Sequence, residues 1–277
     1  MSIEEKVSRH YGHGGNLKRA ILDGLAALGK DPEHIATADL AAVDEFHTGG
    51  REATVEIAAA LGAHPAMRLL DLGSGIGGPA RFFAETHGCH VIGIELTEEF
   101  VHVAETLTRR TGLAEHVTFR QGSVLELPFP PASFDAATLI HVGMNIADKR
   151  GLFAEVRKAL VTGGLFVVYD MMRLAEGELR YPVPWAKNAE TSFLASLAQY
   201  RTALERTGFT ILAERERRQF ALEFFARRRA AAAAEGGPPA LSFHLILGPD
   251  FAQKIANLTA NIEDGLLAPC EIVARSI

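Results

Sequence analysis

Residues 69–81 read LLDLGSGIGGPAR, and this stretch decides the fold that the sequence predicts. The apolar run that opens it is short and ends at a glycine, which is typical of a buried parallel strand. Gly73, Gly75 and Gly77 allow a tight turn and a close approach of the backbone to a ligand. Pro79 suits the first turn of a helix. The stretch therefore predicts a strand, a glycine loop and a helix whose free N–H groups face a ligand.

The glycines alone do not identify that ligand. Gly73, Gly75 and Gly78 also satisfy the pattern G-x-G-x-x-G of dinucleotide-binding loops, which is weak evidence when it stands alone. Asp71, two positions before the first glycine, separates the two interpretations. A dinucleotide places its pyrophosphate at the start of the helix, where a nearby carboxylate would repel it. Asp71 therefore favours a cationic ligand.

The same stretch resembles the first motif of class I S-adenosylmethionine-dependent methyltransferases. Its wording is most similar to the small-molecule branch, whose members act on sterols, quinones, or amines such as sarcosine and dimethylglycine. A second likeness lies at residues 160–164, LVTGG, which resemble the Leu-x-Pro-Gly-Gly turn of that family with threonine in place of proline. The resemblance implies an α/β fold with a doubly wound, mostly parallel seven-stranded sheet of the Rossmann-like methyltransferase type. It also implies S-adenosylmethionine as cofactor and transfer of a methyl group to nitrogen, oxygen or carbon of a small molecule.

Composition restricts the class of protein. The chain has 277 residues, 48% of them hydrophobic, and a formal net charge of −6, so no basic excess is available to neutralise nucleic-acid phosphates. No apolar run reaches membrane-spanning length, and the first residues lack a basic-then-apolar signal, so we expect a cytoplasmic protein. Cys89 and Cys270 are then expected to be small core residues.

Strand and helix signals alternate in the way that builds a doubly wound sheet. We expect helices at 16–28, after Thr97, after Asp148 and at 196–207, with Gly163 and Gly164 ending the third of them. The predicted strands are 68–72, 89–94, 117–120, 134–140, 165–169, 210–214 and 270–274.

Three segments fall outside this alternation. Residues 1–50 are expected to form an N-terminal helical cap, and 51–277 the cofactor-binding domain. Within that domain, 171–193 is expected to be a proline-stiffened loop. Residues 219–264 form an insertion with several phenylalanines and a flexible alanine run before Gly236. Because additions around a cofactor sheet commonly enclose the acceptor, we place the substrate between these segments.

Further candidate cofactor contacts lie at the ends of the next two strands. Glu95 ends the second strand, where a carboxylate accepts both hydroxyls of an adenosine ribose. Leu96 follows it and is expected on the adenine face. The segment Gly122, Ser123 and Val124 ends the third strand, where the family usually has an acid for the adenine amino group. Ser123 departs from that pattern, although its hydroxyl still accepts a hydrogen bond. Ser74, within the glycine loop, completes this predicted set.

A general base is required only when the acceptor carries a proton that must leave. The candidate is His141, which follows the fourth strand, because the carboxyl ends of the strands line the crevice and imidazole exchanges protons near neutrality. The alternative is that His141 only packs near the sulfonium or binds substrate. Tyr11 and Gly49 belong to glycine-rich segments typical of lids, and the resemblance implies that they contact the methionine end of the cofactor. The two H-x-x-H pairs lack further ligands, so no metal site is expected.

Two other classes of function remain open from the sequence. The ambiguous glycines permit an NAD-linked oxidoreductase. A protein that keeps the cofactor fold without catalysis is the third possibility. Binding of S-adenosylhomocysteine without NAD distinguishes the first interpretation from the second.

Overall fold

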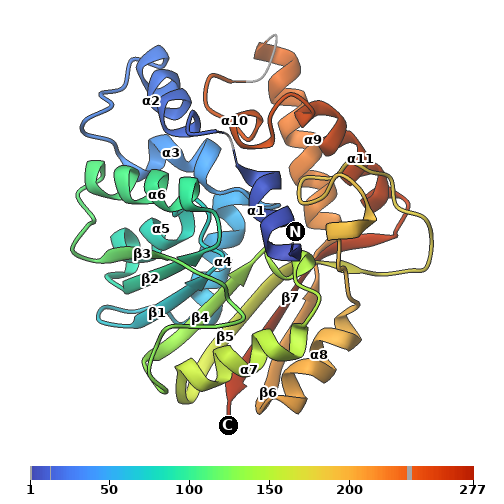
Figure 1. Ribbon diagram of the computed structural model, residues 1–277. Helices are drawn as coiled ribbons and strands as arrows, with labels where there is room; N and C mark the ends of the chain where they lie inside the picture. Colours follow the sequence, from blue (N-terminus) through green and yellow to red (C-terminus); the bar gives the residue numbers. More distant parts are fainter. Residues whose placement is uncertain (1, 13, 236–238) are drawn as a thin grey trace.

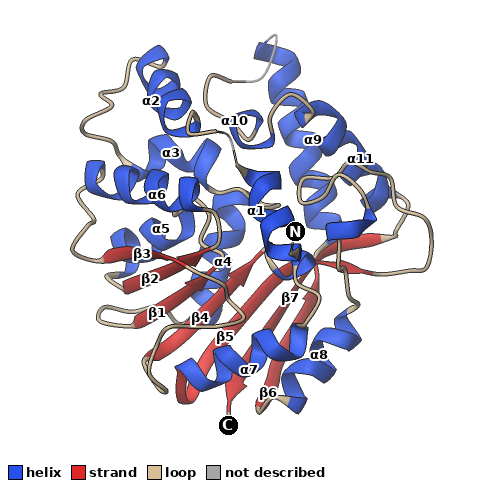
Figure 2. Cartoon of the chain, viewed as in Figure 1, coloured by secondary structure: helices blue, strands red, loops and turns tan. Residues whose placement is uncertain are grey.

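The computed structural model describes residues 2–12, 14–235 and 239–277. One seven-stranded sheet forms its centre (Figure 2). Its strands lie in the order β3-β2-β1-β4-β5-β7-β6, and all are parallel except β7, which is antiparallel to both of its neighbours. The strands are β1 (Arg68–Leu72), β2 (His90–Glu95), β3 (Val117–Gln121), β4 (Phe134–Ile140), β5 (Leu160–Arg173), β6 (Phe209–Glu216) and β7 (Leu267–Ser276). The expected doubly wound, mostly parallel seven-stranded sheet is confirmed.

Helices cover both faces of the sheet and gather above its carboxyl edge (Figure 1). Those between the strands and at the two faces are α4 (Gly50–Leu61), α5 (Gly78–His87), α6 (Glu98–Arg110), α7 (Lys149–Ala159) and α8 (Leu197–Arg206). Above the edge lie α1 (Ile3–Tyr11), α2 (Leu17–Ala27), α3 (Thr37–Asp44), α9 (Arg218–Glu235), α10 (His244–Leu247) and α11 (Phe251–Glu263). Two short 3-10 turns are η1 (Gly143–Asn145) and η2 (Ala189–Thr191).

Two apolar layers hold the helices to the sheet, because successive residues of a strand point to opposite faces. On one face Leu69 of β1 packs with side chains of α4, α5 and α6, and on the other face Leu70 packs with those of α7 and α8. Both leucines are fully buried. A third apolar cluster, centred on Trp185 and Phe225, joins α9, α10 and α11 to the end of β5. The carboxyl edge of the sheet is therefore enclosed by helices rather than open.

Several expectations on local structure were wrong. Gly163 and Gly164 do not end a helix, because α7 ends at Ala159 and Leu160 already pairs with Phe134; the glycines lie in a bulge of β5. β5 also extends to Arg173, into the predicted loop 171–193, because its end pairs with β7.

The alanine run before Gly236 is not flexible chain, because it continues α9 up to Glu235. Alanine has the best helix propensity, which explains the continuation. Gly236 itself lies outside the described residues, as does His13 of the predicted lid. The segment 219–264 therefore lies mostly in α9, α10 and α11.

No helix within the described ranges is long and apolar enough to cross a membrane.

Candidate functional site

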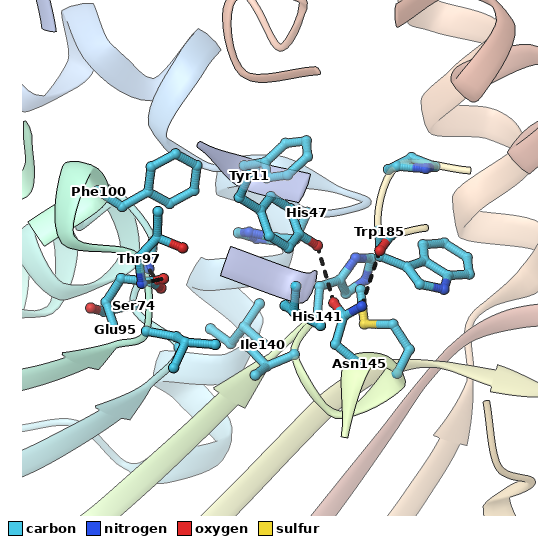
Figure 3. Close-up of a pocket in the computed structure, with 18 of the residues that line it drawn as sticks. Tyr11, His47, Ser74, Glu95, Thr97, Phe100, Ile140, His141, Asn145 and Trp185 are labelled. Atoms are coloured by element: carbon cyan, nitrogen blue, oxygen red, sulfur yellow. Dashed lines mark hydrogen bonds between the residues drawn. The ribbon is translucent and has the colours of Figure 1, made fainter. Parts of the chain in front are cut away.

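A cavity of about 300 Å³ lies at the carboxyl ends of β1, β2 and β4, where the topology of such sheets places ligands. Figure 3 shows side chains from the sheet edge, from α1 and from the loop after β5 that line it. The cavity has two ends of different character. Glycine-loop and strand-end residues form a polar cofactor end. Aromatic and aliphatic residues form an apolar end, made by Phe46, Met144, Trp185, Phe224, Phe225, Phe243, Ile246, Ile255 and Leu258.

The glycine loop turns sharply between β1 and α5. Gly73 has φ +68°, and its N–H donates to the Ile94 carbonyl over 2.7 Å. A Cβ on Gly73 would lie 2.4 Å from a methyl of Val142, so both the backbone conformation and the space require glycine there. The loop therefore packs closely against the residues that follow β4.

Gly73→Ala is expected to lower the free energy of unfolding by about 1–3 kcal/mol, from the left-handed backbone and the contact with Val142. Urea unfolding measures the change. Gly112→Ala is a matched comparison with φ +73° and open space around its Cβ, and only the backbone part of the cost is expected there. Equal losses in the two variants would contradict the contact with Val142.

Asp71 is 2% exposed and reaches the cavity from β1. The strand register places it beside Thr138 of β4, whose hydroxyl donates to Asp71 Oδ1 over 2.8 Å. Asp71 Oδ2 is buried and has no hydrogen-bond partner. Burial raises the pKa of Asp71 to about 6; the bond from Thr138 opposes this rise and the charge of Glu95 adds to it. An unpartnered carboxylate oxygen in a cavity is a ready acceptor for a cationic donor.

Glu95 lies at the end of β2 and organises the backbone around it. Its Oε2 accepts from the Gly75 N–H over 3.0 Å, and its Oε1 accepts from the Thr97 N–H over 2.8 Å. Burial raises the pKa of Glu95, and these bonds oppose the rise. A carboxylate has about four acceptor positions, so it still accepts from a ligand. Thr97 stands at the start of α6 as predicted, but its side chain makes no capping hydrogen bond there.

Ser123 lies at the third strand end, and its hydroxyl donates to the carboxylate of Glu4, a residue of α1. It also accepts from the Leu125 N–H over 3.1 Å. The end of β3 has no acidic residue of its own at this position, and Glu4 of α1 supplies a carboxylate there instead. Nothing in the sequence around Glu4 marks it, because the contact joins residues 119 positions apart.

Helix α1 crosses the mouth of the cavity and is held by polar contacts. Tyr11 Oη donates to Asn145 Oδ1 over 3.1 Å (Figure 3). The Asn145 amide in turn donates to the carbonyl oxygens of Trp185 and Thr191, each over 3.0 Å. Lys6 pairs with Glu190 over 3.3 Å. No residue of α1 is fully buried, and Tyr11 also packs against two of the apolar clusters, so α1 is attached by both polar and apolar contacts.

His141 follows β4 with φ +53°, and its ring stacks on Tyr169 with the ring centroids 5.3 Å apart. Its Nε2 is buried and has no hydrogen-bond partner. Burial lowers the pKa of His141 well below its usual value, and His47 lowers it further. The imidazole is therefore neutral at pH 7, and no carboxylate is paired with it to stabilise a proton.

His47 was not singled out in the sequence, although it lies in the predicted lid segment. It lines the cavity beside His141, with the two ring centroids 6.0 Å apart (Figure 3). Its position depends on the turn between α3 and α4, which no local pattern predicts.

Most of the predicted site residues line this one cavity; they are Tyr11, Asp71, Gly73, Ser74, Gly75, Glu95, Leu96, Gly122, Ser123, Val124 and His141. Two do not. Gly77 packs against Phe119 and Arg81, and Gly49 lies under Phe220, where a Cβ would meet the ring at 2.4 Å. These two glycines are required by packing within the protein rather than by contact with the cavity.

The charged side chains that line the described cavity are all acidic. Its titratable lining comprises two histidines, Tyr11 and the carboxylates of Glu4, Asp44, Asp71, Glu95 and Asp148. No lysine or arginine is among the lining residues that the structure describes. Nor does any group of three or more His, Cys, Asp or Glu within the described ranges fit a metal ion.

Comparison with known proteins relates this geometry to a family. Residues 70–168 match the family described as "Methyltransferase domain". A sterol 24-C-methyltransferase of Gibberella zeae is 37% identical over 112 residues, which is 40% of this chain and 30% of that protein. The matched region covers between 30 and 42% of the first curated relatives, so the chain spans well under half of their length.

Solved structures share the whole fold at lower identity. A phosphoethanolamine N-methyltransferase 2 of Haemonchus contortus in complex with S-adenosyl-L-methionine has a TM-score of 0.76 at 19% identity, covering 100% of this chain and 60% of that one. A geranyl diphosphate C-methyltransferase of Streptomyces coelicolor A3(2), solved with Mg2+, geranyl-S-thiolodiphosphate and S-adenosyl-L-homocysteine, has a TM-score of 0.73 at 21% identity. It covers 100% of this chain and 99% of that one.

Proposed function

We propose that this chain carries a class I S-adenosylmethionine-dependent methyltransferase domain. On that premise, it transfers a methyl group to an uncharged, largely apolar small molecule. The observation that carries the proposal is the cavity itself. Its cofactor end has unpartnered acceptors, and its other end is apolar and has no cation among the described lining residues.

The cofactor end fits the donors that S-adenosylmethionine presents. Asp71 Oδ2 and Ser74 Oγ are both buried without a partner at the glycine loop, and an ammonium group has three N–H donors to offer them. Glu95 has acceptor capacity left for ribose hydroxyls. Leu96 and Val124 supply apolar surface, and Glu4 supplies a carboxylate, where the adenine would lie. When bound, S-adenosylmethionine supplies an electrophilic methyl group on a sulfonium.

The apolar end suits the acceptor. Phe46 and Phe243 pack edge to face with centroids 5.4 Å apart, and Phe224 and Phe225 do so at 5.3 Å. A phosphate or diphosphate placed there would lose its hydration among apolar side chains and find no cation among the lining residues described, at a high desolvation cost. The cavity therefore favours uncharged lipid-like acceptors such as sterols over phosphorylated ones.

The residues of the chain contribute chiefly by holding the two partners in line. Alignment of this kind removes about 7–11 kcal/mol from a barrier. The apolar cover formed by α9, α10 and α11 also excludes water, which strengthens the interaction of Asp71 with a cationic ligand.

A matched pair of acceptors tests the proposal. Incubation with methyl-labelled S-adenosylmethionine is expected to label geraniol, or a sterol with a double bond at C24, at a rate at least tenfold above geranyl diphosphate, about 1.4 kcal/mol of discrimination. Geraniol and geranyl diphosphate share the same isoprenoid chain and differ in the diphosphate group, so the ratio measures how the cavity receives that anionic group. Preferred labelling of geranyl diphosphate or of phosphoethanolamine would contradict it.

The other two classes are separated by binding. Calorimetry is expected to show binding of S-adenosylhomocysteine and none of NAD, since Asp71 would repel a pyrophosphate at the glycine loop. A protein that only binds the cofactor would show the same isotherm and label no acceptor. The cytoplasmic location stays a prediction, which fractionation of cells expressing the full chain checks.

A further inference from the structure

Helix α1 brings one carboxylate to the cofactor end of the cavity. Glu4, in the first turn of α1, lines the cavity, and its Oε1 accepts from the hydroxyl of Ser123, just beyond β3. The Ser2 N–H donates to Glu5 Oε2 over 2.7 Å and the Glu5 N–H donates to Ser2 Oγ over 3.1 Å, which fixes that first turn. A carboxylate has about four acceptor positions, so Glu4 can still accept from a ligand.

The strand register places Ser123 beside the acceptors for the ribose. Glu95, which ends β2, pairs with Gln121 of β3, and its carbonyl oxygen accepts from the Gly122 N–H over 3.0 Å. Ser123 is the next residue along the chain, so the hydroxyl that contacts Glu4 lies one step outward from the paired strand ends. A base joined to a ribose at Glu95 is therefore directed toward the pair formed by Ser123 and Glu4.

The lining around this pair suits a planar base. Leu96 and Val124 follow the ends of β2 and β3 and present apolar side chains for the faces of a ring. Asp148 is a further acid of the lining, but its Oδ1 accepts from the Gly151 N–H over 2.8 Å and caps α7. Glu126, the first acid after β3 along the chain, is exposed and is not among the lining residues that the structure describes. The acid of α1 is therefore the better placed to meet the edge of the base.

We propose that Glu4 accepts a hydrogen bond from the exocyclic amino group of the adenine, so that the base of the cofactor is read by α1 rather than by the sheet. The inference rests on S-adenosylmethionine being the cofactor, as in the proposed function. The amino group supplies two N–H donors, and a bond from one of them to a charged carboxylate is stronger than a bond between neutral groups. A purine without this group has no donor for Glu4, whose carboxylate then loses water without a replacement.

The same helix reaches the acceptor end of the cavity with its last turn. Tyr11 Oη donates to Asn145 Oδ1 over 3.1 Å, and His10 Nε2 lies 2.9 Å from the Pro184 carbonyl oxygen. Asn145 and Pro184 both line the cavity. Because α1 is a single helix of nine residues, a bond added at its first turn also holds its last turn in place (Figure 1). Binding of the adenine is thus expected to close α1 over the acceptor.

Calorimetry with two ligands tests the reading of the base. The probes are S-adenosylhomocysteine and its analogue with purine in place of adenine, in which hydrogen replaces the amino group. The parent chain is expected to bind the analogue about 5- to 30-fold more weakly. In Glu4→Ala the ratio of the two Kd values is expected to fall close to one, and in Glu4→Gln, which keeps a neutral acceptor, to an intermediate value. A ratio in Glu4→Ala equal to that of the parent would overturn the proposal.

Two control variants remove other acids near the same strand end. Glu126→Ala removes the exposed acid after β3. Asp148→Asn changes another acid of the lining and keeps a side chain that caps a helix. Both are expected to keep the ratio of the parent. Loss of the ratio in either control would assign the reading of the base to that acid and contradict the role of Glu4.

Hydrogen exchange tests the closing of α1. With each ligand at saturating concentration, the amides of residues 5–11 are expected to exchange about threefold more slowly with S-adenosylhomocysteine than with the purine analogue. Glu4→Ala is expected to abolish this difference. The amides of α8, which has no residue in the described lining, are expected to exchange alike with both ligands. Equal exchange of α1 with the two ligands in the parent chain would overturn the closing of α1.

Neither measurement uses an acceptor, so failure of this inference stays distinct from failure of the proposed function. A parent chain that binds neither ligand would contradict the cofactor of the proposed function and the inference with it. A parent chain that binds both ligands with the same Kd would contradict the role of Glu4 and leave the cofactor in place.

Discussion

Replacement of Arg81 by methionine is expected to lower the free energy of unfolding by about 3–5 kcal/mol, because it leaves a buried carboxylate without its cation. Arg81 is fully buried in α5, and its Nη2 donates to Asp44 Oδ2 and to the Ile76 carbonyl, each over 2.8 Å. Its Nη1 donates to Thr108 Oγ1 over 3.0 Å. One side chain thus ties α3, the glycine loop and α6 together. Urea denaturation of the full chain measures the loss.

Two comparisons separate burial from the mere loss of an ion pair. Arg227→Ala breaks the ion pair between Arg227 and Glu52, two side chains that are both more than half exposed. It is expected to lower the free energy of unfolding by less than about 1 kcal/mol. Arg81→Met combined with Asp44→Asn removes both charges and is expected to recover part of the stability lost by Arg81→Met alone. A double variant no more stable than Arg81→Met would show that hydrogen bonds to the guanidinium, rather than the charge left on Asp44, dominate the cost.

Asp71→Asn is expected to raise the Kd for S-adenosylmethionine about 5- to 150-fold, the 1–3 kcal/mol cost of losing a charged hydrogen-bond partner. Asparagine keeps an oxygen for the Thr138 hydroxyl, so the variant changes charge and leaves the contact within the sheet. Asp135→Asn provides the control, since this acid pairs with Arg68 at the far end of β4. Calorimetry with S-adenosylmethionine and S-adenosylhomocysteine measures both. A larger loss for S-adenosylmethionine would place Asp71 at the sulfonium, and equal losses would place it at the shared ammonium.

The pH dependence of the same binding follows from the raised pKa of Asp71. With a pKa of about 6 in the free protein, the carboxylate is charged at pH 7 and becomes neutral as the pH falls through 6. A bound cation lowers that pKa, so affinity is expected to be full above pH 7 and to fall below 6. Glu95 contributes with the same sign because burial raises its pKa too. Asp71→Asn should therefore lose part of the dependence, and an unchanged profile in that variant would contradict the role of Asp71.

Short-range patterns predicted the cofactor half of the molecule. The run up to Asp71 and the glycine loop specify strand, turn and helix within a few residues, and the chain forms the expected seven-stranded sheet. The expected resemblance to methyltransferases is found over residues 70–168, which match the methyltransferase-domain family, and in a sterol 24-C-methyltransferase 37% identical over 112 residues. Nothing found supports the oxidoreductase alternative.

Longer-range contacts explain what the sequence did not reveal. Glu4 reaches Ser123, and Arg81 reaches Asp44 across the fold; no local periodicity encodes either approach. The glycines also show that a local pattern does not reveal which distant residue approaches. Gly77 and Gly49 matched a ligand-loop pattern, but the atoms they make room for belong to Phe119 and Phe220. A glycine signals that something approaches its backbone and leaves the identity of the approaching group open.

The connection between β6 and β7 has an evolutionary consequence. Three helices leave the sheet at the end of β6 and return at the start of β7, while the strands that hold Asp71 and Glu95 lie at the other side of the sheet. The recognisable family signature ends at residue 168, before this excursion begins. Substitution of the side chains in residues 218–263 that line the apolar end of the cavity is thus expected to change the class of molecule accepted, while Asp71 and Glu95 keep their positions on distant strands.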